Sequence, residues 1–311
     1  MIADILKSIE EYDKIIIVRH QNPDPDAIGS QVGLKLMLQE AYPNKEVYAT
    51  GIDLPVLDWI GSMDQVSQEV YQDALVIAVD TANAKRIDNA GEYRLADKII
   101  KIDHHPDVDS FGDINWVEDR ISSCSEMIYD LTVQLEPLNL SQESAFKLYA
   151  GIVGDTNRFL YGETSYQTLQ VATNLAKTGI DISQIALHED EMSERLARLE
   201  AYILNNFKLT ESGFGYIIIR KPDLEGFHLQ DGEIDNAVPL IGRINKVNNW
   251  IVVSEKVTDH FRVNLRSKKM PINQIAEKFG GGGHPLASGV YVGSMEQVYE
   301  LIEDMDNLNK I

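Results

Sequence analysis

Three segments rich in isoleucine and valine lead directly into side chains of the kinds that bind metal ions. They are KIIIVR (14–19) before His20, LVIAV (75–79) before Asp80, and KIIKI (98–102) before Asp103, His104 and His105. Further carboxylates of this kind are Asp24 and Asp26 in HQNPDPDAIGS and Asp155 in GIVGDTNRF. The carboxyl ends of parallel strands meet at one crevice, where ligands collect. We therefore expect these side chains to form one cluster.

The chemistry of such a cluster is that of divalent metal ions. Several carboxylates within a few ångströms repel one another unless protons or cations neutralise them. Carboxylate and imidazole groups together suit Mn²⁺ and similar ions, whereas thiolate-rich sites favour zinc. Two ions that share a carboxylate lie about 3.5–4 Å apart, generate a hydroxide, and clamp the attacking and leaving oxygens of a displacement at phosphorus. The pattern thus predicts two-metal chemistry on a phosphate ester.

Each motif taken alone has a simpler interpretation. An aspartate at the end of a strand often caps a helix, and Asp24 or Asp26 could cap one that begins near Ala27. A pair of neighbouring histidines is weak evidence for a metal, and Cys124 in SSCSEM is better explained as a small buried residue than as a nucleophile. The recurrence of such residues after three separate apolar segments favours the metal site.

The segments between these strands have the periodicity of helices. Helical patterns cover 27–42, 124–135, 144–155 and 165–179, and a weaker strand candidate covers 46–51. Strands that alternate with helices predict an α/β fold with a doubly wound parallel sheet, which we assign to residues 1–190.

The rest of the chain predicts a second, smaller mixed α/β domain. Residues 193–209 have the pattern of one amphipathic helix, so we expect a linker helix at 191–209 and the second domain at 210–311. Its strand-like segments are 211–221, 249–257 and 260–267, and its helical patterns are 271–279 and 294–308. We expect the two domains to face each other across a cleft.

The charge of the chain restricts its ligands. It has 28 Lys+Arg against 49 Asp+Glu and a formal net charge of −21, and residues 1–190 hold 14 of the basic and 32 of the acidic side chains. One basic patch, HFRVNLRSKKMPINQIA, contains Arg262 and Arg266 and no acid. This distribution excludes the extended basic surface of a protein that binds long duplexes.

Targeting signals are absent from the sequence pattern. No stretch approaches the roughly 18 unbroken apolar residues of a membrane helix, and the N-terminal MIADILKSIEEYDK lacks the apolar core of a signal peptide. The single cysteine rules out an internal disulfide and fits a reducing compartment. We expect a cytoplasmic protein.

The motifs resemble those of the DHH phosphoesterase family. HQNPDPDAIGS, VDTAN, DHHP and GIVGDTNRF are similar to its four motifs in order, and FGGGGHPLASG resembles the glycine-rich signature of the accessory domain DHHA1. The chain length and DTAN point to the NrnA type within this family. The resemblance implies an enzyme that hydrolyses nanoRNA of about two to five nucleotides to mononucleotides and dephosphorylates 3′-phosphoadenosine 5′-phosphate (pAp) to AMP.

The resemblance also implies roles for the residues of the cluster. It places one metal on His20, Asp24 and Asp80, and a second on Asp26, Asp80, His104 and Asp155, with Asp80 as the bridge. His105 then donates a hydrogen bond near the scissile phosphate, and Asp103 orients a ligand. The implied ions are two divalent cations, Mn²⁺ first and Mg²⁺ or Co²⁺ as alternatives.

The substrate-binding residues are expected in the second domain. Arg262 and Arg266 lie four apart in a strand-like segment and so project from one face, and arginine binds phosphate in a bidentate manner. A run of four glycines cannot form a helix interior, and on composition alone it could be a flexible connector. In DHHA1 domains this segment contacts substrate, which implies that Gly282, Gly283 and His284 do so here.

Several alternatives remain for the function. Within the family they are a RecJ-like exonuclease on single strands, a pyrophosphatase and a cyclic-dinucleotide phosphodiesterase; outside it, a nucleotide-binding regulator without catalysis. We expect substrate to bind in the cleft, with hinge motion near 190–210, and short RNA or DNA oligonucleotides and pAp to be the partners. A homodimer is a further expectation.

Overall fold

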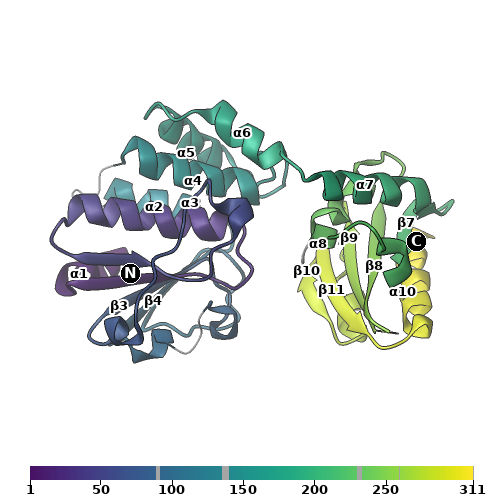
Figure 1. The fold of residues 1–311 in the computed structure, drawn as a ribbon, viewed down its shortest axis with the longest axis horizontal. Helices are drawn as coiled ribbons and strands as arrows, with labels where there is room; N and C mark the ends of the chain where they lie inside the picture. The colour runs from purple at the N-terminus through teal and green to yellow at the C-terminus, as the bar shows by residue number, and fades with distance from the viewer. Residues whose placement is uncertain (89–91, 135–139, 230–232, 259, 311) are drawn as a thin grey trace. The chain divides into compact units, whose positions relative to one another are not determined.

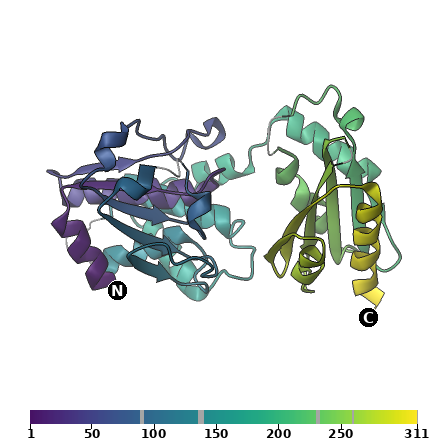
Figure 2. The same ribbon diagram turned by 90° about the horizontal axis from the view of Figure 1, so that it is seen from below.

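The computed structural model describes residues 1–88, 92–134, 140–229, 233–258 and 260–310. The chain forms two compact units, Met1–Glu191 and Met192–Ile311, which are drawn in Figures 1 and 2. No helix within the described residues has the length and apolar character that a bilayer span requires.

The first unit contains a five-stranded parallel sheet with the order β2-β1-β3-β4-β5. Its strands are β1 (Lys14–Val18), β2 (Glu46–Ala49), β3 (Leu75–Val79), β4 (Lys98–Asp103) and β5 (Ile114–Val117). This is one of the two common orders of doubly wound sheets, and its switch point lies between β1 and β3. The predicted α/β fold with a parallel sheet is confirmed.

Helices cover one face of this sheet (Figure 1). They include α2, α3, α4 and α5; the helices of the unit are α1 (Ile2–Glu11), α2 (Pro25–Ala41), α3 (Cys124–Gln134), α4 (Gln142–Asp155), α5 (Tyr166–Ala176) and α6 (Ile182–Asp190). The other face packs against the short 3₁₀ turns η2 (Gln68–Tyr71), η3 (Ala84–Arg86) and η4 (Glu92–Leu95), whereas Leu57 of η1 (Pro55–Leu57) packs in the cluster on the helix face. Ile15 and Ile17 face the helices while Ile16 and Val18 face the turns. Burial on both faces explains why the strands are continuous apolar runs.

The second unit contains a six-stranded sheet with the order β10-β11-β9-β8-β7-β6. Its strands are β6 (Lys208–Leu209), β7 (Phe214–Ile219), β8 (Asn249–Val257), β9 (His260–Ser267), β10 (Gly282–His284) and β11 (Ala287–Val292). Strands β7 and β8 are parallel, and the other neighbouring pairs are antiparallel. The mixed sheet agrees with the predicted mixed α/β domain.

A separate apolar cluster covers each face of the second sheet. The helices and 3₁₀ turns are α7 (Glu194–Asn206), η5 (Lys221–Leu224), α8 (Glu233–Asn236), η6 (Val238–Arg243), α9 (Asn273–Lys278), α10 (Met295–Asn307) and η7 (Leu308–Lys310). α9 and α10 contribute to the cluster on one face, and α7 and η6 contribute to the cluster on the other.

The segment predicted as a linker helix differs from the expectation. Helix α7 ends at Asn206, and Lys208 and Leu209 pair with β7 as strand β6. Leu199 and Ile203 of α7 are fully buried in the core of the second unit, because residues four apart lie on one face of a helix. The amphipathic pattern of this segment therefore results from the packing of α7 on the core of the second unit.

The helices α1, α6 and α8 and the strands β5, β6, β10 and β11 were not among the predicted elements. Residues 135 and 311, which lie at the ends of a predicted helix and of the predicted second domain, are outside the described residues.

Candidate active site

The carboxyl ends of β1, β3 and β4 lie side by side, since these strands are neighbours in the sheet. His20 follows β1, Asp80 follows β3 and His104 follows β4. The Asp80 carboxylate lies between the two imidazoles, with Oδ2 3.4 Å from Nε2 of His20 and Oδ1 3.4 Å from Nε2 of His104. Strand order thus brings together three residues that are up to 84 positions apart in the sequence.

Asp24 both caps a helix and faces the histidine. Its Oδ1 accepts a hydrogen bond of 2.9 Å from the backbone N–H of Ala27 and caps α2, while its Oδ2 lies 3.6 Å from Nε2 of His20. The two interpretations of this residue are therefore compatible, because each oxygen of the carboxylate has a separate partner.

Asp26 is fully buried, and it connects α2 to the start of α3. Its carboxylate oxygens accept hydrogen bonds of 2.7 and 2.9 Å from the backbone N–H groups of Cys124 and Ser125. The unpaired N–H groups at the N-terminus of a helix favour an anion. This contact between Asp26 and the start of α3 is not among the predictions from the sequence, although the serine-rich SSCS segment is a typical start of a helix.

Glycines of α4 allow α2 to approach closely enough to place Asp26 beside Asp155. A Cβ atom at Gly151 would overlap the Ser125 hydroxyl and lie 2.8 Å from Oδ1 of Asp26, and one at Gly154 would lie 2.6 Å from Cβ of Pro25. At the end of α4, Oδ2 of Asp155 lies 3.0 Å from Nε2 of His104.

Replacement of Gly151 by alanine is expected to destabilise the first unit by about 1–3 kcal/mol, because an added methyl group in a packed interior forces its neighbours apart. The shift should appear as a lower midpoint in urea unfolding and as reduced metal-dependent activity. Gly162→Ala is the matched control, since a Cβ there meets nothing within 4 Å. Equal midpoints for the two variants would contradict this account of the close approach.

The described residues include three groups whose ligand atoms lie within 4.8 Å of one another. The groups are His20, Asp24 and Asp80; Asp26, His104 and Asp155; and Asp80, His104 and His105. We call the six residues of the first two groups the metal cluster. The structure brings all six predicted metal ligands together, and Asp80 of the first group also lies 3.4 Å from His104 of the second.

The electrostatics of the metal cluster reflect an excess of buried carboxylate. Burial raises the pKa of Asp26 well above its usual range, and the charges of Asp80 and Asp155 raise it further. Burial disfavours the charge of His20, but hydrogen bonds to Asp24 and Asp80 outweigh this and raise its pKa to about 10. Without another cation, the site therefore retains protons on its imidazoles.

The donor atoms fit divalent cations. Four carboxylates and two imidazoles form an oxygen and nitrogen set of the kind that Mn²⁺ accepts. Oδ1 of Asp80 is buried and, among the described residues, accepts no hydrogen bond. A buried oxygen of this kind requires a partner, and its place between the two groups suits a shared ligand.

His105 is held by Asp103 in a fixed orientation. Its Nδ1 lies 2.8 Å from Oδ1 of Asp103, and its backbone N–H donates to the same oxygen. Asp103 is fully buried beside the buried amino group of Lys101, with 3.4 Å between Oδ2 and Nζ. Lys101 is not among the predicted site residues, although a lysine within an otherwise apolar strand is a detectable signal.

The predicted substrate-binding arginines differ in their surroundings. The Arg262 guanidinium lies over the Tyr291 ring at 4.9 Å and packs against Gly289, and no other described residue bonds to it. By contrast, Nη1 of Arg266 donates to the backbone carbonyls of Leu265 and Ser288. Of the two, Arg262 is the better placed to bind an anion.

The glycine-rich segment forms an edge strand beside Arg262. Gly282 in β10 pairs with Gly289, over which the guanidinium lies, and Gly283 pairs with Ser288. The φ angle of Gly283 is +139°, which favours glycine. Because β10 is at the edge of the sheet, backbone groups on its outer side pair with no strand of the described residues. The adjacent His284 is exposed.

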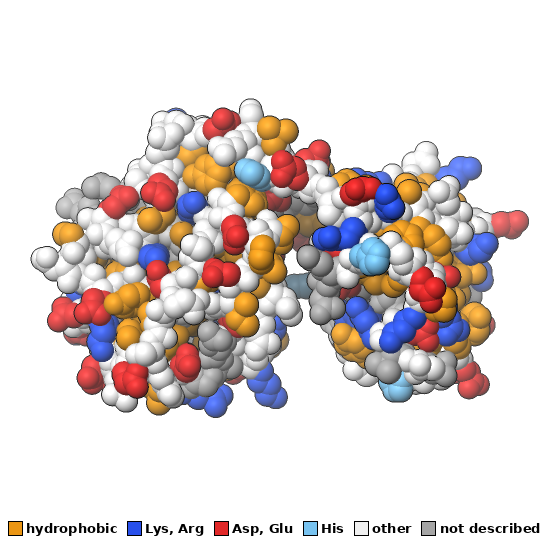
Figure 3. Space-filling model, in the orientation of Figure 1, with side chains coloured by type: hydrophobic (Ala, Val, Ile, Leu, Met, Phe, Trp, Pro, Cys, Tyr) orange, Lys and Arg blue, Asp and Glu red, His pale blue; other side chains and the backbone are white. Residues whose placement is uncertain are grey.

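Basic side chains are more frequent on the second unit. The face drawn in Figure 3 shows more Lys and Arg on the second unit than on the first. Residues 191–311 hold 14 basic and 17 acidic side chains, a net charge of −3, against −18 for residues 1–190. The second unit is therefore the more favourable of the two for an anionic ligand.

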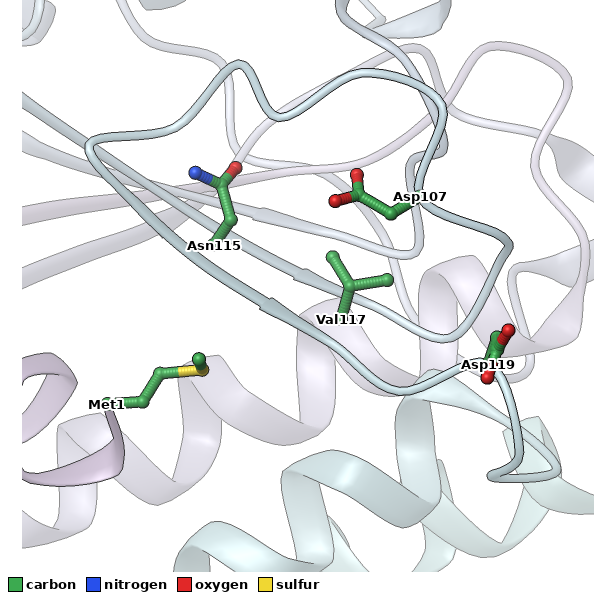
Figure 4. A pocket seen from close by; sticks show the side chains of 5 residues that line it. All are labelled: Met1, Asp107, Asn115, Val117 and Asp119. Atoms are coloured by element: carbon green, nitrogen blue, oxygen red, sulfur yellow. The ribbon is translucent and has the colours of Figure 1, made fainter.

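A pocket in the first unit lies outside the metal cluster. Figure 4 shows it at the edge strand β5, and it is lined by Met1, Asp107, Asn115, Val117 and Asp119. None of these five residues belongs to the three groups of ligand atoms found in the described chain. The pocket thus adds nothing to the candidate site.

Comparison with known proteins identifies the family. The N-terminal domain of the DHH family matches residues 14–152, and the DHHA1 domain matches residues 216–310. The "Bifunctional oligoribonuclease and PAP phosphatase NrnA" of Bacillus subtilis is 40% identical over 312 residues, which cover 100% of this chain and 99% of the relative. The chain belongs to the DHH family.

Two further DHH-family comparisons cover nearly the full length. The "Probable bifunctional oligoribonuclease and PAP phosphatase NrnA" of Streptococcus mutans is 44% identical over 98% of both chains. The crystal structure of an exopolyphosphatase-related protein from Bacteroides fragilis superposes with a TM-score of 0.89 at 28% identity, and covers 100% of this chain and 97% of the other. The predicted resemblance is confirmed, and membership of this family implies the use of divalent metal ions.

Proposed function

We propose that this protein is a metal-dependent phosphoesterase that hydrolyses short oligoribonucleotides to mononucleotides and converts pAp to AMP. The observation that carries the proposal is the metal cluster itself, in which Asp80 lies between two groups of ligand atoms at the ends of three neighbouring strands. Relatives that are 40–44% identical over the full length and named as bifunctional oligoribonucleases and PAP phosphatases support the choice of substrates.

We assign the predicted roles to the residues of the cluster as part of this proposal. His20, Asp24 and Asp80 hold one divalent ion, and Asp26, Asp80, His104 and Asp155 hold the other. When bound, the two ions supply a nucleophile at neutral pH and stabilise charge on the oxygens of an in-line displacement. Manganese is the proposed metal, since the site combines carboxylates with imidazoles and lacks thiolates.

In this proposal His105 contacts the scissile phosphate, and Asp103 orients the His105 ring. Because Nδ1 of His105 lies 2.8 Å from Oδ1 of Asp103, the ring is held in position, and we propose that it donates a hydrogen bond to the scissile phosphate. A donor aimed at a phosphoryl oxygen stabilises the charge that develops there during the reaction.

The second unit supplies the groups that recognise the rest of the substrate. We propose that Arg262 binds a terminal phosphate, with backbone N–H groups of Gly282 and Gly283 and the side chain of His284 as further donors. Arg266 supports this surface through its hydrogen bonds to the backbone of β9 and β11. A single local set of donors on an acidic protein favours substrates with few phosphates.

The proposed preference for short substrates has a direct test. With Mn²⁺, the protein is expected to release mononucleotides from a 5′-phosphorylated RNA dinucleotide and AMP from pAp, and to leave a 24-mer and pyrophosphate nearly intact. Chromatography of the products over time measures all four reactions. Comparable turnover of the 24-mer would favour the RecJ-like alternative. Turnover confined to pyrophosphate would favour a pyrophosphatase. No turnover with any of several metals would favour a nucleotide-binding regulator without catalysis.

The cytoplasmic location and the homodimer stay as predictions within this proposal. Cell fractionation and light scattering of the purified protein measure them independently of activity.

A further inference from the structure

Lys101 is a charged side chain in the interior of the first unit. It lies in β4, where its neighbours Ile100 and Ile102 face the helices, and its own side chain is fully buried on the opposite face of the sheet. An ammonium group loses its hydration when it is buried and needs polar partners in exchange. The contacts of the Lys101 amino group identify these polar partners.

The amino group of Lys101 connects two loops that carry residues of the site. It donates hydrogen bonds of 3.0 Å to the backbone carbonyls of Ala82 and Asp109, and a longer one of 3.5 Å to Oδ1 of Asp107. Ala82 belongs to the loop that begins with Asp80, and residues 107 and 109 belong to the loop that follows His105. The backbone N–H of Ala84 donates a hydrogen bond to the Asp109 carboxylate. This is a second link between the same two loops.

The same amino group lies beside the carboxylate that orients His105. Its Nζ is 3.4 Å from Oδ2 of Asp103, and this oxygen is buried and has no hydrogen-bond partner among the described residues. The other oxygen of Asp103 contacts Nδ1 of His105 at 2.8 Å. A continuous chain of polar contacts therefore runs from Lys101 through Asp103 to His105.

We propose that Lys101 is a positioning residue for the phosphoesterase reaction, which acts through Asp103 on His105. This inference rests on the proposed function. The amino group of Lys101 contacts Oδ2 of Asp103 and so fixes the position of this carboxylate, whose other oxygen holds the imidazole of His105 with Nδ1 turned inward. Lys101 itself does not contact the substrate.

A purely structural role explains the arrangement less well. Apolar residues of similar volume usually stabilise an interior as well as or better than a buried ion pair, and the two positions that flank Lys101 in β4 are buried isoleucines. The retained charge lies next to the orienting carboxylate and between the site loops.

The test compares Lys101→Met with the wild type in kcat, KM and Mn²⁺ affinity. The variant keeps the length of the side chain and removes its charge. We expect kcat for pAp to fall by about 10- to 100-fold, as is typical when a residue that orients a catalytic group is lost. The Mn²⁺ dissociation constant should change by no more than about twofold, because no proposed ligand is removed. Lys35→Met is the matched control, because it removes a lysine of α2 whose Nζ lies 2.6 Å from Oδ2 of Asp64. The kcat of this control should equal that of the wild type.

A double-mutant cycle separates positioning from a general loss of stability. If Lys101 acts through His105, the Lys101→Met/His105→Asn variant should have the same kcat as His105→Asn alone, within about twofold. Losses that multiply, or a wild-type kcat in Lys101→Met, would overturn the inference. If Lys101→Met does not fold, Lys101→Met/Asp103→Asn is compared with Asp103→Asn, and a further decrease in kcat would overturn it. Absence of turnover in the wild type would instead contradict the proposed function.

Discussion

Replacement of Asp80 by asparagine is expected to abolish hydrolysis of both pAp and dinucleotides. Asp80 lies between His20 and His104 and is adjacent to both groups of the metal cluster, so the substitution removes a ligand from each proposed ion at once. Two ions supply several kcal/mol of stabilisation in the transition state, and each 1.4 kcal/mol is a factor of ten in rate. We expect kcat/KM to fall by about 1,000-fold or more.

Asparagine is the informative replacement for structural reasons. The φ angle of Asp80 is +48°, in the left-handed region, which asparagine tolerates better than alanine does. The exposed Asp73 has a φ angle of +56°, so Asp73→Asn is a control with the same chemical change and similar backbone geometry.

Two measurements distinguish loss of the site from loss of the fold. Circular dichroism should be unchanged in Asp80→Asn. We expect Mn²⁺ to raise the Tm of the wild type and not that of the variant, since a ligand stabilises only the protein that binds it. Turnover at the wild-type rate would refute the assignment of Asp80 as the shared ligand.

Replacement of Arg262 by methionine is expected to raise KM for pAp by about 100-fold, because a bidentate pair with a phosphate contributes two charge-assisted hydrogen bonds of about 1.5–3 kcal/mol each, not fully additive. The kcat value should change much less, since Arg262 is far in sequence from the metal ligands and is proposed to bind a distal phosphate. Arg262→Lys should recover only part of the affinity, because an ammonium group cannot form the bidentate pair.

The surroundings of Arg262 provide a second variant for the same prediction. A Cβ at Gly289 would lie 2.7 Å from Nη2 of Arg262, so Gly289→Ala should displace the guanidinium and raise KM without removing the charge. Arg198→Met removes an exposed arginine of α7 and is the control. Bis-p-nitrophenyl phosphate, which has no distal phosphate, should be hydrolysed equally by all of these variants. An unchanged KM for pAp in Arg262→Met would contradict the proposed role.

The two arginines illustrate the limit of arguments from spacing. Positions 262 and 266 lie on the same face of β9, as the spacing predicted, since both alternate with the buried Phe261, Val263 and Leu265. Spacing does not reveal the partners of a side chain. The carbonyls that bond to Arg266 come from β9 and β11 together, and the pairing of β11 with β9 depends on the whole sheet.

The sequence by itself determined the three apolar strands β1, β3 and β4, the ligand type at the end of each, the glycine-rich segment and the uneven charge. These features are local, because a strand or helix is recognisable from the period of its apolar residues over a short window. The ordered motifs also sufficed to indicate the family.

Only the tertiary structure decided which of these residues become neighbours. The order β2-β1-β3-β4-β5 places Asp80 between His20 and His104, the glycine at position 151 brings Asp26 toward Asp155, and Lys101 is buried against a loop eight residues away. Such contacts depend on the packing of segments that are distant in the chain, and packing at close range is set by the shapes of all the elements together. These contacts depend on many distant parts of the sequence at once, so the apolar period of a single segment does not predict them.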